Sequence, residues 1–268
     1  MRLIIQNNYE AVSKWTANYI VRKILDFKPT KEKPFVLGLP TGSTPVGTYK
    51  EIIKLHKAGK ISFKNVVTFN MDEYVNVPED DPGSYHYFMK TNFFDFIDIP
   101  KQQINILNGN TKDPVKECTV YERKIKNAGG IELFLGGMGS NGHVAFNEPM
   151  SSLLSKTRMV NLTYETRTAN SRFFDDDVNK VPESALTVGI NTIMEAREVL
   201  LIVNGIKKSV ALQKCMEEGV NSAWPASALQ LHPRALIVCD EEATAELKIK
   251  TVSYFMDVEK NNLNPVKI

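Results

Sequence analysis

Two hydrophobic patterns alternate along the chain, and each predicts a different kind of element. Short apolar runs predict strands, and apolar residues that recur every three or four positions predict helices. The expected strands are residues 3–5 (an edge strand), 34–39, 65–69, 104–107, 133–135, 185–188, 199–203 and 235–238. The expected helices cover residues 10–27, a segment through Tyr49 and Ile53, and residues 84–94, 114–126, 207–216 and 243–258.

This alternation predicts an α/β fold with an open, mostly parallel sheet and helices on both of its faces. No repeat, low-complexity tract or linker interrupts the pattern, so we expect residues 1–268 to form a single domain. The pattern weakens over residues 150–185, a polar stretch that carries Arg158 and Arg172. We interpret this stretch as a flap, which is either a mobile cover or a packed connection.

Composition narrows the possible partners. The apolar share of 43% and the charged share of 24% are typical of globular proteins, and a net charge of +2 with dispersed lysines gives no reason to expect nucleic acid. No apolar run is long enough to span a bilayer, so no membrane partner is expected. Cys118, Cys215 and Cys239 form no CxxC pair. Their spacing argues against a disulfide framework or a zinc site and favours a reducing, cytoplasmic location.

The most informative stretch is residues 132–149, ELFLGGMGSNGHVAFNEP, in which a buried strand ends in glycines and polar residues. Glycines such as Gly137 let the backbone approach a ligand closely. His143 and Glu148 are candidates for an acid/base pair, because a carboxylate fixes the tautomer of an imidazole and supports its cation. Asn141 can accept a hydrogen bond there but brings no charge. The alternative is a histidine bonded to backbone in a turn; a metal site is disfavoured because the helical HExxH spacing is absent.

Two other predicted strands also end in polar groups. The sequence GLPTGSTP joins strand 34–39 to a helix, and its backbone and hydroxyl groups suit a phosphate; the residues concerned are Thr41, Gly42, Ser43 and Thr44. The alternative is a helix start capped by serine or threonine, with Pro45 in the first turn. Asp72 and Glu73 follow strand 65–69, where a carboxylate is placed like a general base or like a cap of the next turn. Adjacent carboxylates usually point apart, so we expect only one of them to serve the site.

Taken together, the motifs resemble glucosamine-6-phosphate deaminase over nearly the whole chain. They are GLPTGSTP, FNMDEY, GHVAFNEP, NSRFFD, VPESALTVG and LQLHP, in this order. The resemblance implies an open α/β sheet of modified dinucleotide-binding type and conversion of glucosamine 6-phosphate and water to fructose 6-phosphate and ammonia. It implies a sugar-phosphate partner and neither a metal nor an organic cofactor.

The resemblance also implies roles for individual residues. Asp72 matches the base that moves a proton between C2 and C1 through a cis-enolamine, His143 the group that opens the pyranose ring, and Glu148 a carboxylate that supports it. The phosphate and sugar contacts match Thr41–Thr44, Arg172 and Lys208. In the hexameric bacterial members an activator, N-acetylglucosamine 6-phosphate, binds between subunits, and Ser151, Arg158 and Tyr254 match that site. A homohexamer is therefore the expected assembly.

This sequence departs from the family pattern at a few positions. Asn141 stands where an aspartate is usual beside the histidine, which predicts reduced turnover and an altered pH profile, by analogy with catalytic triads that lose their acid. Val160 replaces the usual lysine of the activator site, so activation is expected to be weak. Residues 221–225 (NSAWP) and Met150 also differ, and the sequence offers no account of their effect.

Two other functions remain open at this point. A 6-phosphogluconolactonase-like hydrolase shares a glycine-rich loop with a histidine, but a lactonase has no need of the C2 base that Asp72 matches. A sugar-phosphate-binding paralogue that has lost catalysis is favoured by Asn141 and disfavoured by the presence of the other site residues.

Overall fold

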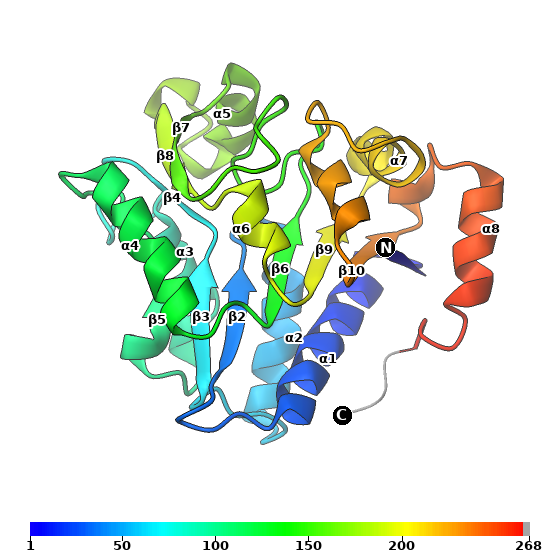
Figure 1. Cartoon of the computed structure of the whole chain (residues 1–268), viewed down its shortest axis with the longest axis horizontal. Helices are drawn as coiled ribbons and strands as arrows, with labels where there is room; N and C mark the ends of the chain where they lie inside the picture. Colours follow the sequence, from blue (N-terminus) through cyan, green and yellow to red (C-terminus); the bar gives the residue numbers. More distant parts are fainter. Residues whose placement is uncertain (265–268) are drawn as a thin grey trace.

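Seven strands form one parallel sheet in the order β1-β10-β9-β6-β2-β3-β5. The computed structural model describes residues 1–264. The strands are β1 (Arg2–Gln6), β2 (Phe35–Leu39), β3 (Val66–Asn70), β5 (Ile104–Asn105), β6 (Leu133–Gly137), β9 (Val199–Val203) and β10 (Ala235–Asp240). As the sequence predicts, β1 lies at an edge. The structure places β6, which precedes the glycine-rich loop, at the centre of the sheet (Figure 1). In open α/β sheets, ligand sites lie at the carboxyl ends of such strands.

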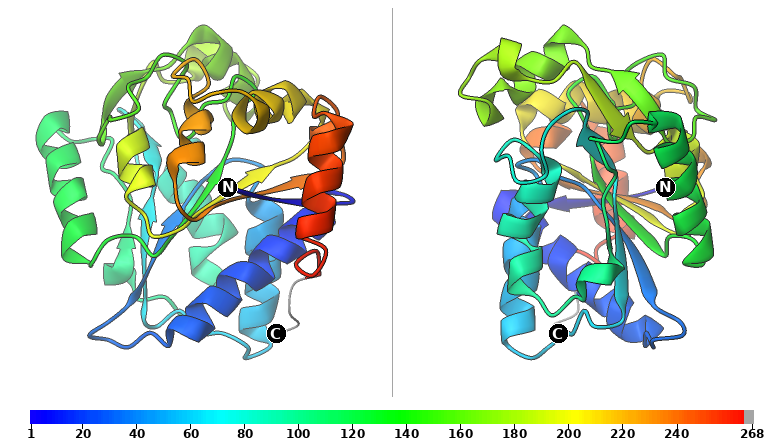
Figure 2. Two further views of the ribbon diagram at one scale, coloured as in Figure 1. Left: turned by 45° about the vertical axis from the view of Figure 1, so that its right-hand side comes forward. Right: turned by 90° about the vertical axis from the view of Figure 1, so that its left-hand side faces the viewer.

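The side chains of each strand alternate between the two faces of the sheet, so the sheet is buried on both sides. In β1, Leu3 and Ile5 join one core and Ile4 joins the other. One face is covered by α1 (Tyr9–Phe27), α2 (Val46–Lys57) and α3 (Tyr85–Asn92). The other is covered by α4 (Pro114–Asn127), α6 (Ile190–Met194) and α7 (Ser209–Glu217). The right-hand view of Figure 2 shows these two helical layers, and none of the described helices is long and apolar enough to cross a membrane.

A second, three-stranded antiparallel sheet lies above the carboxyl ends of the main sheet (Figures 1 and 2). It consists of β4 (Asp72–Tyr74), β8 (Ser184–Thr187) and β7 (Arg158–Asn161), in that order. Residues 150–185 are thus in part a packed connection, because Val160 and Leu162 contact a small apolar cluster that includes Tyr74 and Phe146. Beyond β7 the same segment forms α5 (Tyr164–Asn170), which stands at the top of the molecule.

The structure corrects several expected elements. The closing helix, α8 (Ile249–Val258), begins six residues later than residue 243, because the chain turns extended at Lys248 and Leu247 packs into the core. The strand at 104–107 is reduced to the two residues of β5. The strand at 185–188 exists as β8 but belongs to the antiparallel sheet.

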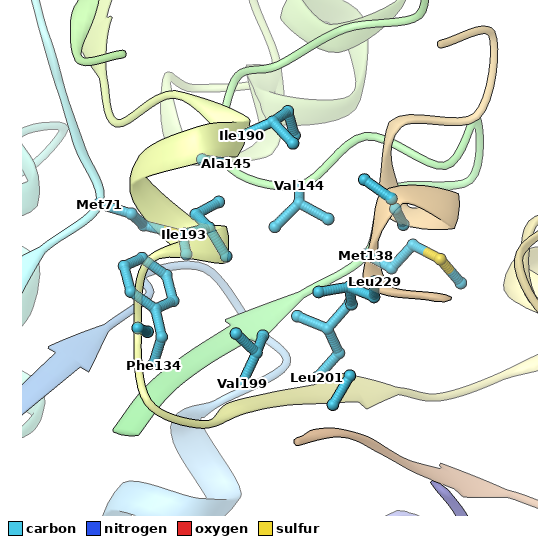
Figure 3. Close-up of a cluster of buried hydrophobic side chains, with 14 of the residues drawn as sticks. Met71, Phe134, Met138, Val144, Ala145, Ile190, Ile193, Val199, Leu201 and Leu229 are labelled. Atoms are coloured by element: carbon cyan, nitrogen blue, oxygen red, sulfur yellow. The ribbon is translucent and has the colours of Figure 1, made fainter. Parts of the chain in front are cut away.

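Apolar packing fixes the loop that follows β6. Figure 3 shows Val144 and Ala145 of this loop packed with Ile190 and Ile193 of α6 above the sheet residue Phe134. All five are at least nine-tenths buried, and burial of each of the four side chains larger than alanine contributes about 1.5–3 kcal/mol. The loop that carries His143 is therefore anchored directly after the histidine.

Candidate active site

A cavity of about 210 Å³ lies where the carboxyl ends of β2, β3 and β6 meet the flap. The structure brings nearly all of the sequence-predicted site residues to its wall: Thr41, Gly42, Ser43, Thr44, Asp72, Gly137, Asn141, His143, Arg172 and Lys208. Glu148 stands behind this wall and contacts it through Asn141. The parallel sheet explains the convergence, since the carboxyl ends of its strands meet at one edge.

Asp72 lies on one side of the cavity with only 5% of its surface exposed. As the first residue of β4 it pairs with Thr187 of β8, so the small sheet fixes its backbone. Burial, together with the nearby charge of Glu73, raises the pKa of Asp72 well above the ordinary range for a carboxyl group. A carboxylate of this kind is a stronger base than one in water.

Glu73 points away from the cavity, as expected for the neighbour of Asp72 on a strand. Its carboxylate accepts hydrogen bonds from the backbone N–H groups of Tyr85 and His86, each at 3.0 Å, and lies 2.7 Å from the His86 ring nitrogen Nδ1. Glu73 therefore caps the start of α3, and the prediction that only one of the two carboxylates serves the site is supported by their geometry.

His143 lies on the other side of the cavity in a tight turn. The Gly139 N–H donates to the His143 carbonyl at 2.8 Å, and a side chain at Gly139 would overlap the imidazole ring. The segment NSAWP packs on this turn: Trp224 contacts Gly142, and the Ala226 N–H donates to the Gly142 carbonyl at 2.9 Å. The unusual residues at 221–225 thus support the histidine loop.

Asn141 is hydrogen-bonded to both Glu148 and His143. Its amide Nδ2 donates to Glu148 Oε2 at 2.9 Å, and its Oδ1 accepts from the His143 backbone N–H at 3.3 Å. His143 Nδ1 lies 3.7 Å from Glu148 Oε2, which is beyond hydrogen-bond range, and this buried nitrogen has no other partner among the described residues. The predicted pair is close enough for charge attraction, and an approach of about 1 Å would create a hydrogen bond.

Glu148 is strongly acidic in this setting. Burial opposes its ionisation, but His143, the Thr166 hydroxyl and the Asn141 amide outweigh it and lower the pKa of Glu148 to about 2. The Thr166 hydroxyl of α5 donates to Glu148 Oε1. The flap is thereby tied to the carboxylate that faces His143, and Glu148 is an anion at neutral pH.

The opposite end of the cavity is built for an anion. The side chains of Ser43 and Thr44 do not cap α2, whose cap position is taken by Pro45 without a side-chain hydrogen bond. The interpretation of GLPTGSTP as a serine- or threonine-capped helix start is therefore wrong, and these hydroxyls remain available to a ligand. Arg172 reaches across from the flap and donates to Ser43 Oγ at 3.2 Å. Burial and the nearby Arg172 charge lower the pKa of Lys208 to about 8, so an incoming anion would stabilise two adjacent cations.

Of the three predicted activator residues, only Ser151 and Arg158 meet within one chain. Arg158 lies 3.5 Å from Ser151 Oγ, and it donates to Asn147 Oδ1 at 2.8 Å. Tyr254 lies on α8, which packs beside β1 on the other side of the molecule (Figure 1). Val160, in place of the usual lysine, pairs with Ala185 and packs on the small apolar cluster, so it offers no cation.

Several wall residues were not predicted from the sequence: Tyr85, Phe146, Glu165, Thr166, Asn170 and Phe173. Asn170 and Phe173 lie within the NSRFFD motif, so their motif was a usable signal. Tyr85 carries no local signal, because only the packing of α3 on β4 brings it to the cavity. Within residues 1–264 no group of three or more His, Cys, Asp or Glu side chains could hold a metal ion, and the three cysteines are buried and free.

Known proteins share both the sequence and the fold. A model of the family "Glucosamine-6-phosphate isomerases/6-phosphogluconolactonase" matches residues 7–238. Glucosamine-6-phosphate deaminase of Borreliella afzelii is 60% identical over 264 residues, which is 98% of each chain. The deaminase of Parabacteroides distasonis is 58% identical over 268 residues, covering 100% of this chain and 99% of that one.

Solved structures agree with this relationship. A monomeric glucosamine-6-phosphate deaminase superposes with a TM-score of 0.87 at 40% identity and covers 92% of this chain and 100% of its own. The 6-phosphogluconolactonase of Trypanosoma cruzi has a TM-score of 0.74 at 20% identity over 92% of this chain and 97% of its own, which is a likeness of fold alone. The chain therefore belongs to the glucosamine-6-phosphate isomerase/6-phosphogluconolactonase family and, within it, to the glucosamine-6-phosphate deaminases.

Proposed function

We propose that this chain converts glucosamine 6-phosphate and water to fructose 6-phosphate and ammonia in the cytoplasm. One observation carries the proposal: a buried carboxylate and an imidazole face the same cavity, whose other end holds two cations and a helix start. A lactonase needs a water and an acid/base group but no carbon base, so Asp72 favours the deaminase. The relatives at about 60% identity carry that activity in their names.

In the proposed binding mode, the phosphate lies at the amino end of α2. Residues 41–44 supply backbone and hydroxyl donors, and Arg172 and Lys208 supply positive charge. The sugar then extends toward Asp72 and His143. Since Lys208 has a pKa of about 8, a bound phosphate dianion would keep it protonated at neutral pH.

The proposed chemistry divides between the two sides of the cavity. His143, supported by the Glu148 anion, moves the proton that opens the pyranose ring. Asp72 then removes the C2 proton and returns it to C1 through a cis-enolamine, a task for which its raised pKa is suited. Water adds to the resulting C2 imine, and ammonia leaves to give the ketose.

Asn141 is expected to slow ring opening. Its amide occupies Glu148 Oε2 and brings no charge of its own to the imidazolium. The loss in related triads reaches about 10⁴-fold, and we expect a milder effect here because Glu148 remains an anion next to His143.

We also propose that the chain forms a homo-oligomer, with a hexamer as the assembly implied by the sequence motifs. The structural neighbour at 40% identity is described as monomeric, so the test is the molar mass in solution by light scattering. A mass of about 30 kDa, that of one chain, would reject the hexamer.

The decisive test of the proposed activity is a coupled assay of fructose 6-phosphate formation with glucosamine 6-phosphate as substrate, together with direct measurement of ammonia. We expect both products in equal amounts. Calorimetric binding of the sugar phosphate without turnover would instead identify a binding paralogue, the alternative that Asn141 favours. Hydrolysis of 6-phosphogluconolactone without ammonia release would identify a lactonase.

A further inference from the structure

A tyrosine of the first helix contacts the phosphate loop from outside the cavity. Tyr9 is the first residue of α1, and the single proton of its hydroxyl is shared between the carbonyl oxygens of Ser43 and Thr44, at 3.2 and 3.0 Å. The same hydroxyl accepts a hydrogen bond from the Gly47 N–H at 2.9 Å. One side-chain atom thus joins the last part of the turn after β2 to the first turn of α2.

These contacts supply what α2 lacks. The first N–H groups of a helix have no intrahelical partner and are usually satisfied by an N-cap side chain. Pro45 occupies the cap position of α2 and makes no side-chain hydrogen bond. The Tyr9 hydroxyl satisfies the Gly47 N–H instead, so the cap comes from another helix.

Close packing makes this contact possible. A side chain at Gly47 would place its Cβ 2.9 Å from the Tyr9 hydroxyl and would overlap Ser13 of α1. Glycine at this position therefore lets α1 approach the start of α2, and the two helices lie side by side (Figures 1 and 2). Ser13 Oγ is buried and has no hydrogen-bond partner among the described residues. The small side chain at position 13 is therefore explained by its steric fit against Gly47.

The contacts of Tyr9 determine which groups of residues 43–44 remain free for a ligand. Because the tyrosine caps the helix and fixes the carbonyls of Ser43 and Thr44, the hydroxyls of both residues stay free of the helix cap. Ser43 Oγ instead accepts from Arg172 across the cavity. The turn is thus held from behind through its backbone and from the front through the flap.

We propose that Tyr9 is a positioning residue for the substrate phosphate: acting from α1, it caps α2 and holds residues 43–44 in the geometry that receives the anion. The inference rests on the proposed function only for the identity of the substrate. A pre-formed cradle lowers the ordering that a ligand must induce, so Tyr9 acts on affinity for the phosphate and leaves proton transfer at Asp72 and His143 unchanged.

The test is Tyr9→Phe, which keeps the ring and removes the hydroxyl. Loss of a helix cap costs about 1 kcal/mol. If the ligand must then order the phosphate-binding turn, its dissociation constant rises by a factor of about five. We expect the KM for glucosamine 6-phosphate and the calorimetric Kd for inorganic phosphate to rise by that factor while kcat changes by less than about two-fold. Tyr87→Phe is the matched control, because Tyr87 is 38% exposed on α3 and its hydroxyl makes no hydrogen bond among the described residues.

A second variant approaches the same contact from α2. Gly47→Ala should displace the Tyr9 hydroxyl and raise KM and the phosphate Kd, and the double variant with Tyr9→Phe should add little to the larger single effect. This variant keeps the proposal testable if Tyr9→Phe fails to fold.

The outcomes separate the two proposals. Unchanged KM and phosphate Kd in Tyr9→Phe, with an active parent chain, would overturn the positioning role and leave the proposed function intact. A fall in kcat at constant KM would overturn it as well. If the parent chain releases no ammonia, the proposed function fails, and the phosphate Kd of Tyr9→Phe still decides whether the tyrosine shapes the anion site.

Discussion

At the scale of single residues, the two sides of the cavity place carboxyl groups in opposite electrostatic environments. Asp72 is buried beside Glu73 with no hydrogen-bond donor among the described residues, and its pKa is raised. Glu148 receives hydrogen bonds from Asn141 and Thr166, and its pKa is lowered to about 2. Environments that separate the pKa values of two titratable groups indicate different tasks for them, which in the proposed mechanism are those of a carbon base and a permanent anion.

Replacing Asp72, the candidate base, should lower the activity and raise the thermal stability. Asp72→Asn is expected to lower kcat by about 10²–10⁴-fold, the range for loss of a general base. A carboxyl group with a raised folded-state pKa stabilises the fold only while it is protonated, and this contribution is lost as the pH rises through that pKa. The variant should therefore have a higher Tm than the parent at pH values above the Asp72 pKa. The assay and thermal unfolding across pH check both effects.

The control for this prediction is Asp26→Asn, at an aspartate whose side chain is 65% exposed on α1. It should leave kcat and Tm nearly unchanged. A fully active Asp72→Asn enzyme would contradict the assignment of the base.

Restoring a charge beside the histidine should accelerate ring opening. Asn141→Asp is expected to raise kcat, because a carboxylate stabilises the imidazolium better than an amide does. The amide that donates to Glu148 Oε2 is lost and a second negative charge is added, so the pKa of Glu148 should rise from about 2. The pH dependence of kcat should change as well.

The measurement is the coupled assay on both chains over a pH series. Equal kcat values for the parent and Asn141→Asp would show that the asparagine does not limit turnover. Asn141→Ala separates the two effects, because it removes the hydrogen bond to Glu148 without adding charge.

At the scale of elements, α3 and β4 share one buried carboxylate. Glu73 accepts from the backbone N–H groups of Tyr74, Tyr85 and His86, so it joins the strand of Asp72 to the helix start beside it. Glu73→Gln keeps the shape but removes the charge. We expect a lower free energy of unfolding, by about 1–3 kcal/mol, because the amide cannot accept all of these bonds.

The same variant should alter the pH profile. The Glu73 charge helps to raise the pKa of Asp72, so its removal should lower that pKa and move the acid limb of kcat/KM to lower pH. Urea unfolding and a pH series test the two parts. Glu79→Gln, at a side chain that is 62% exposed near His86, is the control; an acid limb that stays in place in Glu73→Gln would show that the two carboxyl groups are not coupled.

At the scale of the whole molecule, an activator site of the family type needs two chains. Ser151 and Arg158 lie near β7, and Tyr254 lies on α8 beside β1, on the other side of the molecule (Figure 1). Arg158 is already engaged with Asn147 Oδ1, and Val160 provides no second cation. We therefore expect N-acetylglucosamine 6-phosphate to leave the substrate curve unchanged.

Initial rates at low substrate, with and without N-acetylglucosamine 6-phosphate, measure this directly. Val160→Lys is the informative variant, since restoring the cation should create a response only if the chain also assembles. A leftward shift of the parent's substrate curve would contradict the prediction. The single-domain boundary at 1–268 likewise stays a prediction.

The sequence by itself determined the order of the principal elements and the glycine-rich ends of β2 and β6. Short apolar runs such as Leu3 to Ile5, whose side chains are buried on both faces of the sheet, need no information from distant residues to be predicted as strands, because the signal lies in consecutive residues. The motifs around Asp72 and His143 were visible for the same reason. The catalytic roles of these residues, which the motifs imply, stay predictions.

Only the tertiary structure decided the small antiparallel sheet, the partner of Asn141 and the cap of α2. Strands as short as β4 and β7 carry too few residues for a periodic signal, and they form because β8 supplies their hydrogen bonds. The Asn141 amide points to Glu148 because the turn between them closes. Tyr9 reaches Gly47 from another helix. In each case the stabilising contact joins groups that are brought together by folding, and such contacts leave no pattern in neighbouring residues.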